Sequence, residues 1–394
     1  MKKPDALLLA PEAPYPVAGG GAARTASLVE YLARRYALDV IVFRERGQAD
    51  PRAEFPAGLA REVRVIELPH HSKSLPARAA RNLGRFLRAR PPLNDRFSGF
   101  DAEIEDHLRG RQYELAVVEH FWCAAYAERI AAHAATVVLD LHNIESVLCR
   151  RAACTEGWPA RAVFRRFAAA CEELERRWLP RYTLLLAASA EDTRRVGEIA
   201  PGLRCEVYPN TIPLVPAPRR EEEHVVAFSG NWEYHPNVAA ARFFRREIWP
   251  RLRARWPELR WRLVGRNPQG VRKYVADDAR IELTGPVQDA VRELAAAQVV
   301  VAPLLAGSGT RVKIIEAWAA GRAVVATRVG AEGLPGVEGE HLLVADVPED
   351  FAEAVSRLLD SEEERRRLGR AGRILYEQQL SWEAAWGWLG QAGI

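Results

Sequence analysis

Residues 302–317 read APLLAGSGTRVKIIEA, which predicts the end of a buried strand, a loop of small residues and the start of a helix. Gly307 and Gly309 in this loop allow a ligand to approach the backbone closely. A helix start presents free N–H groups and a partial positive charge to an anion. Arg311 and Lys313 oppose the helix dipole unless an anion binds beside them, so the pattern favours a diphosphate site over a solvated loop.

The helix of this stretch is expected to begin near Thr310. Glu316 then lies about two turns into the helix. A carboxylate only accepts hydrogen bonds, which suits it to the paired hydroxyls of a ribose. The stretch therefore predicts a site for a nucleoside diphosphate.

Short apolar runs alternate with helix-like segments along the whole chain. Continuous apolar runs are typical of strands buried on both faces of a parallel sheet, and their alternation with helices predicts doubly wound α/β domains. The expected strands are 6–10, 38–43, 63–68, 115–119, 136–141 and 183–188, then 225–229, 260–264, 281–284, 299–303, 323–327 and 342–345.

A proline-rich segment, residues 208–218, separates two such series of runs. Neither a helix nor a central strand tolerates this composition, so the segment is expected to link two domains. The predicted domains are 1–215, joined by a C-terminal helix at about 379–394, and 216–378. Ligands bind beyond the carboxyl ends of parallel strands, so we expect the site in a cleft across which the domains face each other.

Composition narrows the class of protein. The 394 residues carry a net charge of only +4, from 56 basic and 52 acidic side chains, so nucleic acid is not an expected partner. Five cysteines without a C-x-x-C pair predict reduced thiols. The apolar run 6–10 is too short for a secretion signal, and no apolar stretch approaches the roughly 20 residues of a membrane span. A cytoplasmic location is expected.

Four stretches in the second half, and one in the first, resemble a known family. Residues 308–327 resemble the E-x7-E region of retaining GT-B glycosyltransferases of family 4, and the form G-S-G-T-R-x-K-x-x-E-A is similar to bacterial sugar transferases of exopolysaccharide systems. FSGNWEYHPN, at 228–237, is similar to the opening of their C-terminal domain. Shorter matches lie at 263–266, 283–287 and, in the first half, 140–145.

The resemblance implies two Rossmann-like domains of GT-B type. It also implies retaining transfer of a sugar from a UDP- or GDP-sugar to a hydroxyl of a glycan or lipid-linked glycan, as in polysaccharide biosynthesis. The N-terminal domain would bind the acceptor and the C-terminal domain the nucleotide sugar. No cofactor is expected.

The resemblance also implies roles for individual residues. Glu316 would hold the ribose, Lys313 and Arg311 would stabilise the departing diphosphate, and His120 would approach the donor sugar or acceptor. Ser308 stands where the family has its first glutamate, a departure that affects contacts with the donor sugar. The expected nucleotide-sugar-binding residues are Gly20, Gly21, Gly230, Asn231, Arg266, Val287, Ser308, Gly309 and Thr310, and the expected acceptor-side residues are His142 and Asn143.

Some of these residues have a structural interpretation as well. The glycines at 19–21 form either a flexible turn or a close approach to a ligand, and the dinucleotide spacing G-x-G-x-x-G fails at Arg24. His120 and His142 each follow a predicted strand, where they meet either a ligand or only a local hydrogen-bond partner. Arg266 is either a phosphate contact or a surface side chain.

A metal site is not expected. Asp140, His142 and Glu145 do not have a recognised metal-ligand spacing. No Asp-x-Asp occurs in the sequence, so the diphosphate charge would be balanced by the helix start and its basic side chains.

Residues 72–93 contain no acidic side chain. A helix over 77–90 would place arginines on one face and apolar side chains on another. This pattern fits either peripheral attachment to an anionic membrane, such as the inner face of the cytoplasmic membrane, or an ordinary solvated face. The arginines are Arg78, Arg81, Arg85 and Arg88.

Two other functions remain open at this stage. A nucleotide-sugar epimerase on the same fold would release an altered sugar without using an acceptor. A non-catalytic protein that binds nucleotide sugars is conceivable because of Ser308.

Overall fold

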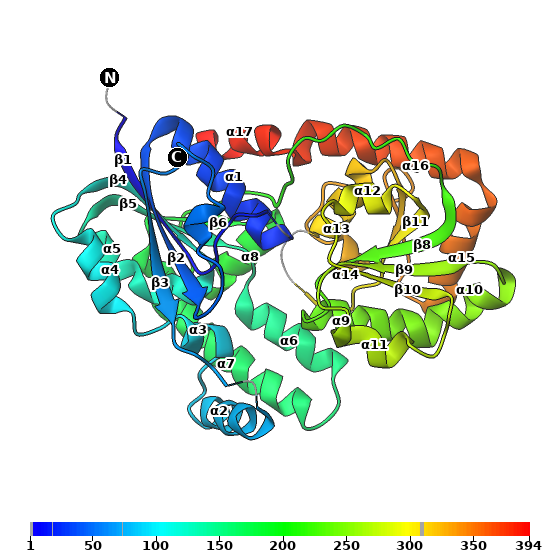
Figure 1. Ribbon diagram of the computed structural model, residues 1–394, viewed down its shortest axis with the longest axis horizontal. Coiled ribbons are helices and arrows are strands. Elements are labelled where there is room, and N and C mark those ends of the chain that lie inside the picture. The colour runs from blue at the N-terminus through cyan, green and yellow to red at the C-terminus, as the bar shows by residue number, and fades with distance from the viewer. Residues whose placement is uncertain (1–2, 18, 73, 308–310) are drawn as a thin grey trace. The chain divides into compact units, whose positions relative to one another are not determined.

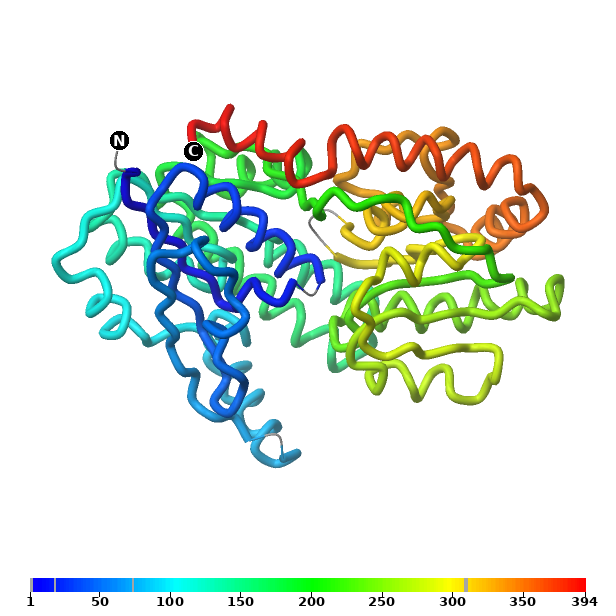
Figure 2. Tube along the Cα trace, turned by 45° about the horizontal axis from the view of Figure 1, so that its top comes forward, coloured from blue at the N-terminus to red at the C-terminus, as the bar shows by residue number. Residues whose placement is uncertain are grey.

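The computed structural model describes residues 3–17, 19–72, 74–307 and 311–394 (Figures 1 and 2). The chain divides into two compact units, Met1–Pro209 with Trp386–Ile394, and Asn210–Ala385. In the described part of the chain, no helix combines the length and apolar character needed to span a membrane.

The first unit is built on a seven-stranded sheet with the order β3-β2-β1-β4-β5-β6-β7. Every pair of neighbours is parallel. The chain order reverses between β1 and β4, and ligands of doubly wound sheets bind beyond the carboxyl ends of the strands at such a reversal. The strands are β1 (Asp5–Ala10), β2 (Ala37–Glu45), β3 (Glu62–Leu68), β4 (Tyr113–Glu119), β5 (Ala134–Leu141), β6 (Leu184–Ala187) and β7 (Cys205–Val207).

Helices connect these parallel strands (Figure 1). The C-terminal end of α17 packs on α1, where Trp386 Nε1 donates to Ser27 Oγ over 3.1 Å. The helices are α1 (Gly20–Arg35), η1 (Pro51–Ala53), α2 (Leu75–Leu87), α3 (Pro92–Arg96), α4 (Asp101–Leu108), η2 (Phe121–Tyr126), α5 (Ala127–Ala131), α6 (Glu145–Thr155), α7 (Ala160–Trp178), η3 (Leu179–Arg181), α8 (Ala190–Ile199) and α17 (Trp382–Ala392).

The second unit contains a six-stranded sheet with the order β10-β9-β8-β11-β12-β13, again parallel throughout. Its chain order reverses between β8 and β11, so the segments that follow these two strands occupy the expected ligand position. The strands are β8 (Glu223–Ser229), β9 (Arg260–Val264), β10 (Ile281–Gly285), β11 (Ala297–Ala302), β12 (Ala323–Ala326) and β13 (Leu343–Val344).

Helix α13 (Val312–Ala319) is fixed in this unit by a fully buried tryptophan. Trp318 Nε1 donates to His341 O over 3.0 Å. A Cβ atom on Gly372 would lie only 2.2 Å from Trp318 Cδ1, so a glycine is needed where α16 crosses the ring. The other helices are α9 (His235–Phe243), η4 (Phe244–Ile248), α10 (Trp249–Arg255), α11 (Gln269–Val275), α12 (Ala290–Leu294), α14 (Arg328–Ala331), α15 (Pro348–Asp360), α16 (Glu362–Leu375) and η5 (Tyr376–Leu380).

The predicted fold class, two doubly wound parallel α/β domains, is confirmed. The structure adds the short edge strand β7 and the helix α6, and α13 begins at Val312, slightly later than expected. Residues 210–215 fall in the second unit because Tyr376 holds them: its hydroxyl donates to Pro213 O over 2.5 Å and accepts from Val215 N over 3.0 Å. The assignment of acceptor and nucleotide to separate domains stays a prediction.

Candidate functional site

At the reversal point of the first sheet, the structure brings together the site residues predicted from the sequence of the first unit. Gly20 opens α1 after the loop that leaves β1. A Cβ atom on Gly21 would lie 3.9 Å from both His120 Nε2 and His142 Nδ1. The small residues at the start of α1 thus leave open the space beside two imidazoles. Asn143, also predicted, follows His142 and is half-buried.

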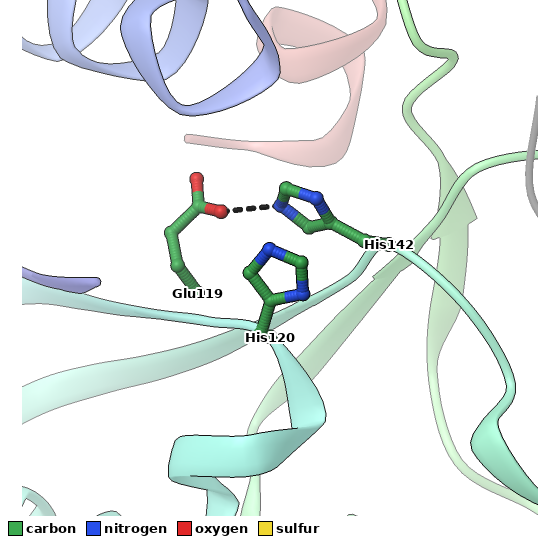
Figure 3. Close-up of side chains that lie close together, drawn as sticks. All are labelled: Glu119, His120 and His142. Atoms are coloured by element: carbon green, nitrogen blue, oxygen red, sulfur yellow. Dashed lines mark hydrogen bonds and ion pairs between the residues drawn. The ribbon is translucent and has the colours of Figure 1, made fainter. Parts of the chain in front are cut away.

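His120 has a backbone conformation that is rare for a side-chain-bearing residue, with φ 62° and ψ 139°. Its ring stacks on Trp122 and on His142, with centroid distances of 4.1 and 3.5 Å. Figure 3 shows the rings of His120 and His142 next to each other. Such backbone strain costs about 1–3 kcal/mol and concentrates at functional sites. Burial, together with the positive charges of His142 and Arg24, lowers the pKa of His120 well below its usual value, so the ring is neutral near pH 7.

His142 is held by two carboxylates. Its Nε2 lies 2.5 Å from Glu119 Oε2 (Figure 3) and 3.4 Å from Asp140 Oδ2. Thr25 Oγ1 donates to the same Glu119 oxygen over 3.1 Å. Burial opposes a charge here, but Glu119 and Asp140 outweigh it and raise the pKa of His142. The arrangement favours a charged His142 stacked on a neutral His120.

The fully buried ion pair between Arg24 and Asp140 lies next to His142 and stabilises this group. Arg24 Nε and Nη2 donate to the two oxygens of Asp140 over 2.7 and 2.5 Å. Arg24 Nη1 also donates to Tyr208 O over 2.5 Å. Burial would raise the pKa of Asp140, but Arg24 and His142 lower it below its usual value. The pair joins α1 to β5 and so fixes the helix start beside the two histidines.

Sequence reasoning missed these supporting residues. In the sequence Arg24 stands out only as the position where a glycine motif fails, and Glu119 only as the end of a predicted strand. Asp140 is considered there only as a metal ligand, which its spacing does not favour. The sequence did contain a signal for Glu119 and Asp140. Each lies near the end of an otherwise apolar run, and burying a charge there costs free energy unless a partner is present.

The one candidate metal cluster among the described residues is Glu119, His120 and His142, whose ligand atoms lie within 4.8 Å of one another. Two ligands of one zinc ion lie roughly 3 Å or more apart, because each bond is about 2.0–2.2 Å long. In the structure Glu119 and His142 are 2.5 Å apart and hydrogen-bonded, so binding one ion through both would need these two side chains to move apart. Glu145 accepts from Trp122 Nε1 over 3.0 Å instead of joining the cluster.

At the reversal point of the second sheet, β8 and α13 meet through a hydrogen bond. Ser229 Oγ, at the end of β8, donates to Glu316 Oε2 over 3.0 Å. Lys313 lies one turn earlier on α13, with its Nζ 6.0 Å from the centre of the Phe228 ring. Burial raises the pKa of Glu316. Burial and the charge of Arg311 lower the pKa of Lys313 to about 8.

Arg311 is buried immediately before α13. Its Nε donates to Val329 O over 3.2 Å, and Nη2 lies 3.8 Å from a Glu332 carboxylate oxygen. A Cβ atom on Gly307 would lie 3.0 Å from Arg311 Nη1, so the guanidinium packs against the loop after β11. These contacts fix Arg311 beside the predicted diphosphate loop. Ser308, Gly309 and Thr310, predicted in that loop, lie outside the described residues.

The loops after β8 and β9 contact each other closely. A Cβ atom on Gly265 would lie 2.0 Å from Gly230 O, so the approach requires a glycine. Asn231 Oδ1 accepts from Asn267 Nδ2 over 2.9 Å, which links the same loops. Arg266 is exposed. The structure thus places Gly230, Asn231 and Arg266 together, as predicted for one binding region, while their contact with a nucleotide stays a prediction.

Val287 lies after β10 and lines a surface pocket of about 580 Å³. Asp289, in the same pocket, contributes to the raised pKa of Glu316 through its negative charge. The segment after β10 therefore lies within electrostatic range of Glu316. The other residues lining this pocket are Arg219, Arg220, Gln288, Arg292 and Glu293.

Comparison with known proteins identifies part of the chain. Residues 223–361 match the family model for glycosyl transferases group 1. This domain contains Ser229, Lys313 and Glu316, and it confirms the predicted enzyme class, a glycosyltransferase. A search of curated protein sequences found no match.

Solved structures share the fold of the whole chain. Sucrose-phosphate synthase from Thermosynechococcus elongatus is 18% identical with a TM-score of 0.74, and the match covers 99% of this chain and 98% of that one. HepE from Anabaena, in complex with UDP and glucose, is 14% identical with a TM-score of 0.65, covering 98% of both chains. An S. aureus TarM variant, in complex with fondaparinux, alpha-GlcNAc-glycerol and UDP, is 10% identical with a TM-score of 0.67, covering 98% of this chain and 99% of that one. These matches agree with the predicted GT-B fold.

Proposed function

We propose that the protein is a retaining, family 4-like glycosyltransferase that uses a UDP- or GDP-sugar and acts in polysaccharide synthesis. The acceptor is a hydroxyl of a glycan or lipid-linked glycan. The observation that carries this proposal is the Ser229–Glu316 pair beside Lys313, at the reversal point of the sheet in the glycosyl transferases group 1 domain. The bound UDP named for HepE and TarM supports a nucleotide donor.

In this proposal the second unit binds the nucleotide. Glu316 accepts hydrogen bonds from the ribose hydroxyls, while the hydrogen bond from Ser229 holds one oxygen of the Glu316 carboxylate in place. Lys313, Arg311 and the N–H groups at the start of α13 stabilise the diphosphate as it leaves. The segments that contain Gly230, Asn231 and Arg266 line the same region.

The first unit contributes the acceptor side. The transition state of glycosyl transfer is oxocarbenium-like, so positive charge develops at the sugar. A neutral His120 accepts a hydrogen bond from a sugar or acceptor hydroxyl without adding opposing charge. The acceptor hydroxyl attacks the face from which the diphosphate departs, its oxygen forms the new glycosidic bond, and a phosphate oxygen takes its proton. His142 and Asn143 lie on the acceptor side.

The proposed reaction needs no divalent ion or cofactor. The charge of the leaving group is balanced by Lys313, Arg311 and the helix start.

A donor screen tests this function. The protein is incubated with UDP- and GDP-sugars and a panel of glycan and lipid-linked acceptors, and freed UDP or GDP is measured with and without EDTA. We expect acceptor-dependent release from one donor, undiminished by EDTA and lost in Glu316→Ala, with the anomeric configuration retained in the product. Altered sugar released without acceptor would show an epimerase, and tight donor binding without turnover would show a non-catalytic protein. Loss of turnover in EDTA would contradict metal independence.

A further inference from the structure

Helix α2 directs three leucines away from the protein, whereas Phe86 is half-buried against Arg166 of α7. The side chains of Leu75, Leu83 and Leu87 are 78%, 58% and 65% exposed. These leucines lie on one side of the helix, at spacings of eight and four residues. No side chain of α2, all of whose residues the structure describes, is buried. We call Leu75, Leu83 and Leu87 the leucine face.

The opposite side of α2, which carries arginines, packs on the protein. Arg85 is only 11% exposed, and its Nε donates to Asp95 Oδ2 over 2.8 Å. Arg81 is half-buried, and its Nη1 donates to Ser72 O over 3.4 Å. A surface helix normally buries its apolar stripe and exposes its charges. This helix has the reverse orientation, so the leucine face is available to a partner.

The orientation is fixed by the neighbouring helix. Arg166 of α7 donates to Phe86 O over 2.6 Å and to Leu87 O over 3.1 Å, at the C-terminal end of α2. Both views show α2 at the outer edge of the first unit (Figures 1 and 2). The leucine face is therefore presented by a helix that is held in place at one end.

We propose that the leucine face of α2 inserts into the interfacial region of an anionic lipid bilayer. Charge complementarity selects this partner: the sequence from 72 to 93 contains no acidic residue, and Arg78 in α2 and Arg88 at its end are exposed. Arg90 is exposed as well, 3.7 Å from Asp95. An interfacial helix buries apolar side chains below the headgroups while its arginines reach the lipid phosphates. The sequence left open whether Arg81 and Arg85 meet a membrane or solvent. In the structure Arg81 bonds Ser72 and Arg85 bonds Asp95.

A second copy of the chain fits the leucine face less well. A 13-residue helix is about 20 Å long and about 10 Å wide, so its exposed side offers about 200 Å². Stable protein interfaces bury about 800 Å² on each partner. Two copies would also bring their flanking arginines together, whereas anionic lipids would neutralise them. The membrane contact goes beyond the proposed sugar transfer, because lipid binding requires neither donor nor acceptor.

Vesicle flotation of the full chain tests the proposal. The vesicles contain phosphatidylcholine alone, or phosphatidylcholine and phosphatidylglycerol in equal parts, without nucleotide sugar. We expect the protein to float with the phosphatidylglycerol vesicles. The double change Leu83→Glu with Leu87→Glu should weaken this partitioning at least about tenfold, because two apolar anchors become charged. The double change Arg78→Ser with Arg88→Ser should reduce the preference for phosphatidylglycerol.

A matched control separates this effect from a general effect of added charge. Leu214 is 53% exposed in the second unit, and Leu214→Glu should float like the unchanged protein. Equal thermal unfolding of all variants verifies their folding. The proposal is overturned if the unchanged protein stays in solution with both vesicles, or if the double glutamate variant floats equally well. It is also overturned if sedimentation without lipid shows a dimer that the two glutamates dissociate, since the face would then serve a second copy.

Discussion

Ser229 Oγ donates a 3.0 Å hydrogen bond to Glu316 Oε2 and so joins the end of β8 to the middle of α13. Ser229 is almost fully buried, whereas Glu316 is half-buried. The serine therefore orients a carboxylate whose remaining hydrogen-bonding capacity suits a ribose. The pair lies within the segment that matches glycosyl transferases group 1.

Replacing Glu316 by alanine should abolish transfer while the protein stays folded. Two hydrogen bonds to a carboxylate contribute about 1.5–3 kcal/mol each, so we expect a loss in kcat/KM of more than about a hundredfold. Ser229→Ala should cost less, about tenfold, because the carboxylate remains. Steady-state kinetics with thermal unfolding as a check of folding measures both. A wild-type rate in Glu316→Ala would remove this residue from the site.

Replacing Lys313 by alanine should weaken binding of UDP or GDP more than binding of the free nucleoside. The cation interacts with the diphosphate, and the nucleoside lacks that group. Isothermal titration of both ligands against both proteins gives the comparison. Equal losses for nucleoside and nucleoside diphosphate would show that Lys313 does not contact the phosphates.

The affinity for the diphosphate should fall as the pH rises through about 8. Burial and Arg311 lower the pKa of Lys313 to about 8, so the side chain is a cation below this pH and neutral above it. An anion prefers the cationic form, and binding is therefore strongest at lower pH. Lys313→Arg should keep its affinity at higher pH, because arginine stays protonated. A flat profile for the unchanged protein between about pH 7 and about pH 9, one unit either side of that pKa, would contradict the assignment.

Asp140→Asn should destabilise the first unit strongly. It leaves the fully buried Arg24 guanidinium without its counter-charge, a change that costs about 3–5 kcal/mol in the free energy of unfolding. Removing both charges, with Arg24→Met and Asp140→Leu, should cost less than the single change. Urea unfolding measures the three free energies. A single variant as stable as the original would show that the ion pair does not hold α1 to β5.

His120→Gly should be more stable than His120→Ala by about 1 kcal/mol or more. Both variants lose the ring that stacks on Trp122 and His142, but only glycine accepts φ 62° without strain. Both should lose most of the transferase activity, because the proposed contact to the sugar or acceptor is gone. Thermal unfolding and kinetics of the two variants provide the comparison. An alanine variant as stable as the glycine variant would show that the backbone at His120 is unstrained.

The apolar runs of the sequence were enough to predict most of the two sheets. The run 299–303 corresponds to β11 and the run 115–119 to β4, because strands buried on both faces must be apolar throughout. The same pattern placed His120 directly after a strand and Glu316 on the helix that follows another strand. Residues that follow parallel strands gather at one edge of a sheet, so their grouping could be expected.

The partners of buried charges could not be predicted in this way. Arg24 and Asp140 are 116 residues apart, and their contact depends on β1, β4 and β5 being neighbours in the sheet. The order of the strands within the sheet cannot be read from the sequence. The exposure of the leucine face could not be predicted either. An amphipathic pattern defines two sides of a helix but not which side packs on the domain.

A crystal structure with UDP or GDP bound tests the central claim most directly. The account predicts that the ribose hydroxyls lie within hydrogen-bond distance of Glu316 and that the diphosphate contacts Lys313 and the start of α13. A nucleotide bound elsewhere, with Ser229 and Glu316 left untouched, would contradict it.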